Sequence, residues 1–150
     1  MNWKKTISTL ILLRILGWGF LITVPIRDAF AVQNPGWVYT WSYFLIAMIV
    51  IFLLLDATAI WALKKLNDKP IRIFVMYSSY ASFIASVPPL IYFFICPVAV
   101  FKQNTTEFYI LLGILLLSLI ILVIVSVKKI ELEETTKQLA EPVEAEVNEE

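Results

Sequence analysis

Four stretches of the chain are almost entirely apolar, and short polar segments separate them. They cover residues 7–26, 42–63, 71–101 and 107–127. An apolar run of about 20 residues is long enough to cross the hydrocarbon core of a bilayer as an α-helix. Backbone groups in lipid must be hydrogen-bonded within the segment, which favours helices. The pattern predicts an all-α, polytopic membrane protein whose residues 1–129 form a four-transmembrane-helix bundle.

The first run contains an arginine, Arg14, and we expect it to end near Pro25, because proline disfavours a helix interior. A secretory signal peptide is the alternative for this segment, since Ala29-Phe30-Ala31 resembles a small-residue cleavage site. The run is longer than the apolar part of such a peptide and is interrupted by a charge. A retained membrane-spanning helix is therefore the favoured interpretation.

The third run is too long for a straight crossing. As one helix it would measure ~46 Å, whereas the hydrocarbon core is ~30 Å thick. Pro88 and Pro89 lack backbone N–H groups, which leaves the carbonyls of Ile84 and Ala85 without helical donors. We expect a kink or break near residue 88, either as a packing feature or as a hinge of the kind found in transporters.

Basic residues are distributed unequally between the two sides of the predicted membrane. Cytoplasmic loops of membrane proteins carry an excess of Lys and Arg. This rule predicts four crossings with both termini in the cytoplasm. The residues on the cytoplasmic side would be Lys4, Lys5, Lys64, Lys65, Lys69, Arg72, Lys128 and Lys129, against Arg27 and Lys102 on the other.

Composition supports the membrane class and adds a charge asymmetry. Hydrophobic residues make up 60% of the 150 residues, and the mean hydropathy is +0.83. The net charge of zero hides an acidic carboxyl end. Few large apolar residues occur there, so residues 130–150 are expected to form a mostly disordered cytoplasmic tail, of which only the first turns could continue the fourth helix. The glutamates of this tail are Glu131, Glu133, Glu134, Glu141, Glu144, Glu146, Glu149 and Glu150.

Several kinds of chemistry find no support in the residue types present. The chain has no histidine and a single cysteine, Cys96, so no internal disulfide and no histidine-ligated metal or haem is expected. We expect no cofactor and no metal. Asn104 fits a helix cap with Glu107 better than a glycosylation acceptor. Nucleic-acid binding is not expected either, because no soluble basic face remains outside the membrane.

Two opposite charges lie inside the predicted spanning helices. Arg14 is seven residues from the cytoplasmic start of the first run, and Asp56 is seven residues from the cytoplasmic end of the second. At 1.5 Å per residue, both lie ~10 Å inside the boundary. A lone charge in hydrocarbon is costly. We therefore predict that Arg14 and Asp56 form a buried ion pair within the bundle.

The residues expected around this pair come from the first and third runs. Ser78 lies at the same depth, and a hydroxyl of Ser78, Tyr77 or Tyr80 is expected to complete its hydrogen bonding. Small residues on one face let helices approach closely. The candidates for such packing are Gly17, one turn from Arg14, and the serines at intervals of four, Ser78, Ser82 and Ser86.

Three interpretations of this cluster remain open. It is either structural, fixing the rotation and register of the helices, or a site for a proton, an ion or a lipid headgroup, with Asp56 as the titrating group. A third is that one charge reaches the membrane interface or a partner.

The favoured function is a non-enzymatic membrane protein that acts by association, as an accessory subunit or a self-oligomer. The alternatives are a small transporter or channel and, third, a membrane enzyme acting on lipid. The expected partners are the lipid bilayer and another membrane protein or a second copy. The expected location is a cell membrane, the inner membrane of a bacterium.

Overall fold

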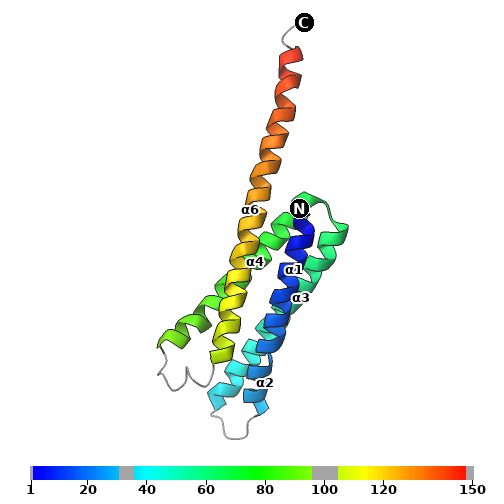
Figure 1. The fold of residues 1–150 in the computed structure, drawn as a ribbon. Helices are drawn as coiled ribbons and strands as arrows, with labels where there is room; N and C mark the ends of the chain where they lie inside the picture. Colours follow the sequence, from blue (N-terminus) through cyan, green and yellow to red (C-terminus); the bar gives the residue numbers. More distant parts are fainter. Residues whose placement is uncertain (1, 31–35, 96–104, 148–150) are drawn as a thin grey trace.

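The computed structural model describes residues 2–30, 36–95 and 105–147, and throughout these ranges the elements are α-helices with no strand. Figure 1 shows their arrangement. In chain order they are α1 (Trp3–Leu21), α2 (Thr23–Phe30), α3 (Gly36–Lys65), α4 (Asp68–Ile95) and α6 (Thr105–Val147).

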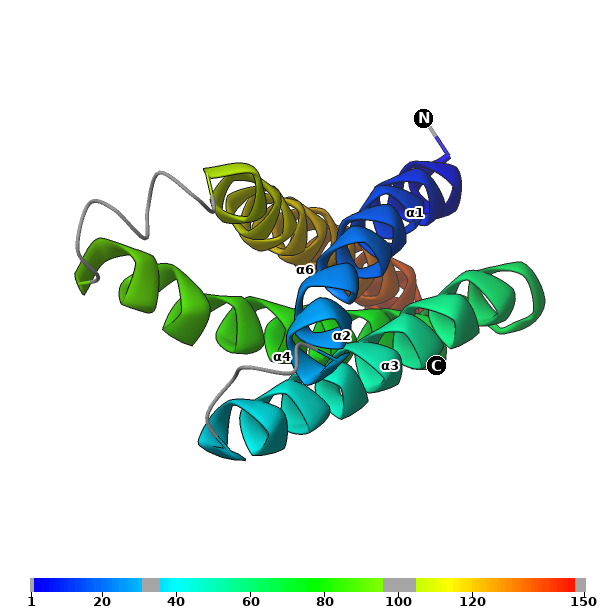
Figure 2. The same ribbon diagram turned by 90° about the horizontal axis from the view of Figure 1, so that it is seen from below.

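The long helices α1, α3, α4 and α6 pack as a bundle in which each packs mainly against two of the others. The neighbouring pairs are α1 with α3, α3 with α4, α4 with α6, and α6 with α1, while α2 packs on α3. The N-terminus, the turn between α3 and α4, and the outgoing part of α6 lie at the same end (Figure 1). At the opposite end the helices splay apart, as the view from below shows (Figure 2).

Three segments are long and apolar enough to span a membrane: Trp3–Arg27, Ser42–Lys65 and Thr106–Gln138. A helical membrane protein is therefore the class that this fold defines. Among the described residues α4 does not meet the same criterion, although it packs between α3 and α6.

The first apolar run is interrupted close to its proline. Helix α1 ends at Leu21, Ile22 is a turn residue, and α2 begins at Thr23. Pro25 has no N–H to donate to the Leu21 carbonyl, and its ring crowds that carbonyl. The Thr23 hydroxyl donates to the Phe20 carbonyl oxygen at 2.7 Å, which supplies a local bond at the interruption.

The third run does not break near residue 88, whereas the expected kink there stays a prediction. Helix α4 continues through Pro88 and Pro89 and ends at Ile95. Two missing N–H groups interrupt only the bonds to the Ile84 and Ala85 carbonyls, and the remaining helical bonds and the packing on α6 maintain the helix. Residues 96–101 of the expected run, including Cys96, and Asn104 lie outside the described ranges.

The acidic tail also differs from the expectation of a mostly disordered segment, because its described part, up to Val147, is helical. Helix α6 runs without interruption from Thr105 to Val147. Residues 131–138 are all exposed, so tertiary contacts do not hold this part. It is rich in good helix formers, and extending an existing helix avoids the cost of nucleation. Lys129 lies 3.9 Å from Glu133, one turn further on, and Lys128 pairs with Glu131.

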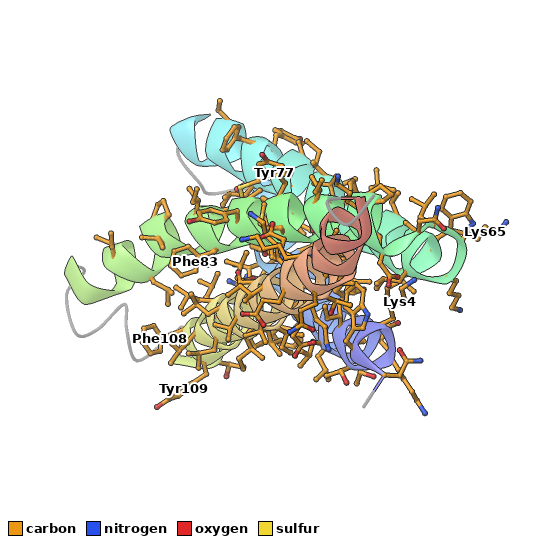
Figure 3. All side chains as sticks on the ribbon, turned by 90° about the horizontal axis from the view of Figure 1, so that it is seen from above. Lys4, Lys65, Tyr77, Phe83, Phe108 and Tyr109 are labelled. Carbon is orange, nitrogen blue, oxygen red and sulfur yellow. The ribbon has the colours of Figure 1, made fainter. Side chains whose placement is uncertain are left out.

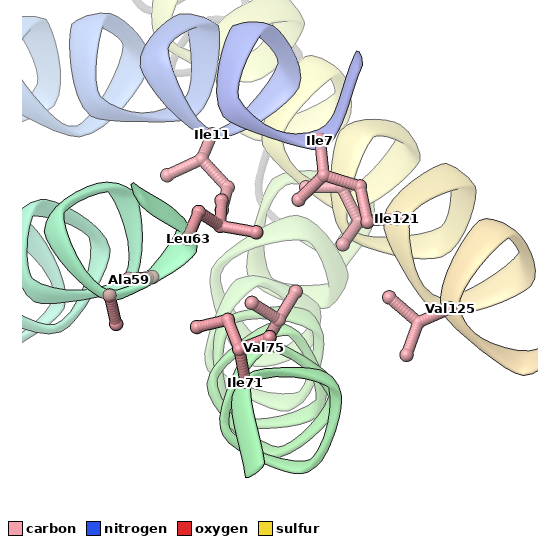
Figure 4. Close-up of a cluster of buried hydrophobic side chains, with 9 residues drawn as sticks. Ile7, Ile11, Ala59, Leu63, Ile71, Val75, Ile121 and Val125 are labelled. Atoms are coloured by element: carbon pink, nitrogen blue, oxygen red, sulfur yellow. The ribbon is translucent and has the colours of Figure 1, made fainter. Parts of the chain in front are cut away.

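Two apolar clusters form the core. The first lies toward the end that carries the N-terminus and joins α1, α3, α4 and α6 (Figure 4). In the second, Trp18 stacks on Phe52 with ring centroids 5.2 Å apart. The residues of the first cluster are Ile7, Ile11, Ala59, Ala62, Leu63, Ile71, Val75, Ile121 and Val125.

Candidate functional site

Arg14 and Asp56 form the ion pair expected from their equal depth. Arg14 Nε donates to Asp56 Oδ2 at 2.9 Å, and Nη2 donates to Oδ1 at 2.5 Å. The arginine is 0% and the aspartate 2% exposed. The guanidinium and the carboxylate therefore meet side by side through two bonds, the geometry that gives such pairs their strength and direction.

The remaining edge of the guanidinium is bonded to two serines. Nη1 donates to Ser79 Oγ at 3.0 Å and to Ser118 Oγ at 3.2 Å. The Ser118 hydroxyl in turn donates to the Ile114 carbonyl oxygen at 2.8 Å. Both serines are 0% exposed. One side chain from each of α1, α3, α4 and α6 thus takes part, and we call Arg14, Asp56, Ser79 and Ser118 the Arg14 network.

The position of the Arg14 network follows from the helical repeat. On α1, Arg14 lies three residues after Ile11, which belongs to the first apolar cluster, and four before Trp18, which belongs to the second. Asp56 and Ser118 are placed in the same way between members of the two clusters on α3 and α6. Residues three or four apart share a helix face. The network is therefore enclosed above and below by apolar side chains.

Because the Arg14 network is buried, its two charges must compensate each other. Each charge alone would cost ~3 kcal/mol at the centre of a membrane helix. Pairing leaves a neutral unit whose donors point at acceptors, so the penalty is largely offset. Neither charged side chain is accessible enough to exchange with water or a solute in this conformation. The arrangement is suited to fixing the rotation of four helices.

The prediction that Ser78, Tyr77 or Tyr80 completes the hydrogen bonding of the ion pair is wrong. Ser78 is buried but donates to the Val75 carbonyl oxygen of its own helix at 3.1 Å. Tyr77 is 66% and Tyr80 55% exposed, on the other side of α4. Successive residues on a helix are rotated by ~100°, so equal depth does not fix which of several neighbours faces inward.

Sequence reasoning missed Ser79 and Ser118. Ser79 adjoins the predicted Ser78, so the error there is one of rotation. Ser118 lies in the middle of an otherwise apolar stretch, LLLSLII. An isolated hydroxyl in such a stretch is itself a signal, because polar groups in membrane helices tend to face the bundle interior.

The residues predicted to allow close helix packing lie at helix contacts or are buried, but their hydrogen bonding differs. A Cβ added at Gly17 would lie 3.0 Å from Ile114 Cγ1, so α1 and α6 approach closely here. Ser82 and Ser86 are buried at 1% and 0% exposure on α4. Ser86 donates to the Phe83 carbonyl oxygen at 2.8 Å, while Ser82 Oγ has no hydrogen-bond partner among the described residues.

The end of the bundle that carries the N-terminus is tied together by a lysine. Lys4 Nζ lies 2.6 Å from Asp68 Oδ1 and donates to the Leu66 carbonyl oxygen at 3.3 Å. Lys4 and Lys65 lie on the same side of the bundle when it is viewed from this end (Figure 3). The amino end of α1 and the turn between α3 and α4 therefore belong to one side of the molecule.

Two shallow surface grooves flank the first turns of α1. They measure about 340 and 320 Å³, and neither is lined by a member of the Arg14 network. Within the described ranges, no group of three or more His, Cys, Asp or Glu side chains could hold a metal ion.

Comparison of this chain with protein-family models, with curated proteins and with solved structures gave no match.

Proposed function

We propose that this chain is a membrane protein with four crossings and both termini in the cytoplasm, and that it acts by association as an accessory subunit and not by catalysis. The basic residues at the end that carries the N-terminus and the α3–α4 turn support this orientation. The bacterial inner membrane is the location we propose, where the same rule sets topology.

The observation that carries the proposal is the continuity of α6. Ile121 and Val125 on this helix are 0% and 2% exposed in the bundle, whereas residues 131–138, on the same unbroken helix, are all exposed. A helix rises 1.5 Å per residue, so the part beyond Lys129 reaches ~27 Å away from the bundle. The bundle thus presents an acidic helix at a fixed position (Figure 1).

The charges of this helix favour a basic protein surface as its contact. Lys128 and Lys129 pair with Glu131 and Glu133, but beyond Lys129 the helix still carries six glutamates against a single lysine, Lys137. Of these glutamates, Glu131, Glu133 and Glu134 are exposed within one turn. The cytoplasmic leaflet is negatively charged and repels an acidic segment, which keeps the helix off the membrane and available to a partner. Electrostatic complementarity of this kind mainly increases the association rate and the specificity.

The closed Arg14 network favours association over transport. A transporter that used Asp56 would need a route by which water or a solute reaches its carboxylate. In this conformation the carboxylate is occupied by Arg14 on both oxygens. The network instead holds α6 in a fixed position relative to the other three long helices.

Site-specific photo-crosslinking tests the proposal. A photoreactive amino acid at Gln138, on the exposed part of α6, is expected to give an adduct with one defined protein in intact membranes. The same probe at Val123, which is 61% exposed on the membrane-spanning part of α6, is the matched control. Replacing Glu131, Glu133 and Glu134 together by Gln should remove the Gln138 adduct.

Two results would contradict the proposal. The first is an absence of any specific adduct from Gln138, or an adduct that the three Gln substitutions leave unchanged. The second is ion- or pH-dependent flux in liposomes holding the purified chain that Asp56→Asn abolishes, which would establish the transporter alternative.

A further inference from the structure

Helix α4 has an exposed face opposite to its buried one. Tyr77, Ala81, Ile84, Pro88 and Ile91 are all exposed and are separated by alternating steps of four and three residues. We call these five residues the α4 seam. The buried residues of α4 lie on the other side of the helix and are Ile71, Val75, Ser78, Ser79, Ser82, Ser86 and Leu90.

Tyrosine hydroxyls make this face costly to expose to lipid. Counted from Ile71 at 1.5 Å per residue, the Cα atom of Tyr77 lies ~9 Å and that of Tyr80, beside the seam, ~14 Å into the membrane. The side chains are 66% and 55% exposed. Neither hydroxyl is hydrogen-bonded to another residue of the described ranges, and an unpaired hydroxyl is unfavourable in an apolar environment. A lipid-facing surface of this composition would be stabilised by a partner that offers hydrogen bonds.

The packing of α4 points the same way. This helix is covered on one side by α6 and less extensively by α3. Covering the opposite side with protein would remove the exposure of the Tyr77 and Tyr80 hydroxyls to lipid.

We propose that a second copy of this chain covers the face, with the two α4 helices packed side by side in parallel. This inference rests on the proposed topology and on association as the mode of action, but it uses a surface other than the acidic end of α6. Two copies with the same orientation in one membrane have parallel α4 helices. Steps of four and three residues are the repeat by which parallel helices interdigitate.

The chemistry of the face is complementary to itself, which favours a second copy over an unrelated helix. A two-fold interface brings the same patch of both subunits together. A tyrosine hydroxyl is both a donor and an acceptor, so Tyr77 and Tyr80 can pair with their equivalents without any other polar residue. Ala81, in the seam, allows close approach of the two backbones.

Disulfide trapping in membranes tests the contact. In a Cys96→Ser background, Ala81→Cys and Ile84→Cys are expected to form covalent dimers on mild oxidation. The control is Val123→Cys, on an exposed part of α6 away from the seam, which should stay largely monomeric.

The hydroxyls are tested by a conservative change. Tyr77→Phe with Tyr80→Phe should weaken dimerisation in liposomes about five- to tenfold, measured by energy transfer between labelled copies as lipid is diluted. This magnitude follows from ~0.6 kcal/mol for each interhelical hydrogen bond in membranes. Tyr43→Phe is the matched control, since Tyr43 is 61% exposed on α3.

The outcomes separate this inference from the proposed function. Equal trapping at Val123 and at the seam, or a monomer at all lipid dilutions, would overturn the α4 dimer even if the Gln138 adduct is present. Undiminished dimerisation of the double Phe variant would overturn the role of the hydroxyls. Seam-specific dimers without a Gln138 adduct would support the dimer and reject the tail as the contact for a partner.

Discussion

At the scale of single residues, the Arg14 network explains how a full positive charge is accommodated among apolar helices. The guanidinium donates four hydrogen bonds, two to Asp56 and one each to Ser79 and Ser118. Removing one member of a buried ion pair leaves the other charge without compensation. Removing both members leaves only a loss of hydrogen bonds and of shape, which is less costly.

The ion pair should therefore behave as a unit on substitution. Arg14→Leu and Asp56→Leu are each expected to destabilise the bundle by about 3 kcal/mol or more, and the double variant by less than the sum of the two. Thermal unfolding in mild detergent measures this. Lys5→Leu, which removes an exposed charge from α1, is the control. Single variants with wild-type stability would contradict the structural importance of the pair.

The serines allow a sharper test, because Ser78 and Ser79 are adjacent and differ in their bonds. Ser79→Ala and Ser118→Ala each remove an acceptor from Arg14 and should cost about 1 kcal/mol. Ser78→Ala removes only a bond to its own helix and should be close to neutral. Thermal unfolding of the three variants decides between them. A larger effect at Ser78 than at Ser79 would mean that α4 is rotated from the described position.

The depth of a residue in the membrane can be predicted from the sequence, but the direction in which its side chain faces cannot. Depth follows from counting residues from a membrane boundary, and it is sufficient to pair Arg14 with Asp56. Rotation depends on how the whole bundle packs, so the exchange of Ser78 for Ser79 could not be foreseen. To predict the contact of Ser118 with Arg14, one would have to know that α6 packs against α1 as well as α4.

At the scale of elements, the prolines show that a sequence position does not by itself determine whether a helix breaks. Helix α4 continues through Pro88 and Pro89, while the first run is interrupted at Ile22, before Pro25. Both sites lose backbone donors. The apolar runs and their order could be read from the sequence, since burial in lipid imposes them. The response of each helix to proline depends on its tertiary contacts, which the sequence pattern does not contain.

The close approach of α1 and α6 at Gly17 gives a testable difference between two glycines. Gly17→Val places new atoms where Ile114 lies and is expected to cost about 1–3 kcal/mol through overpacking. Gly19→Val is the matched control, because a Cβ added there would have no neighbouring atom within 4 Å. It should be tolerated. Detergent unfolding temperatures measure both, and equal losses would show that the effect comes from helix propensity alone.

At the scale of the whole molecule, the side on which the acidic helix emerges depends on whether α4 crosses the membrane. In the described part of the chain, α4 is not among the segments found long and apolar enough to span a membrane. It nevertheless packs along α6, which does qualify. With α4 crossing, the α3–α4 turn and the far end of α6 lie on the same side. If α4 did not cross, the helices could not keep the arrangement of Figure 1 in the membrane. The turn and the far end of α6 would then lie on opposite sides, and the acidic helix would not be in the cytoplasm.

Cysteine accessibility distinguishes these two topologies. In a Cys96→Ser background, Asn67→Cys in the α3–α4 turn and Gln138→Cys on α6 are both expected to resist a membrane-impermeant maleimide added to intact cells. Thr40→Cys, exposed near the other end of α3, should react. All three should react after the membrane is permeabilised, which controls for burial.

Reaction of Gln138→Cys but not Asn67→Cys in intact cells would mean three crossings. The parallel α4 pair and a cytoplasmic partner for α6 would then both be excluded, because α4 would lie outside the hydrocarbon core and the glutamates on the opposite side.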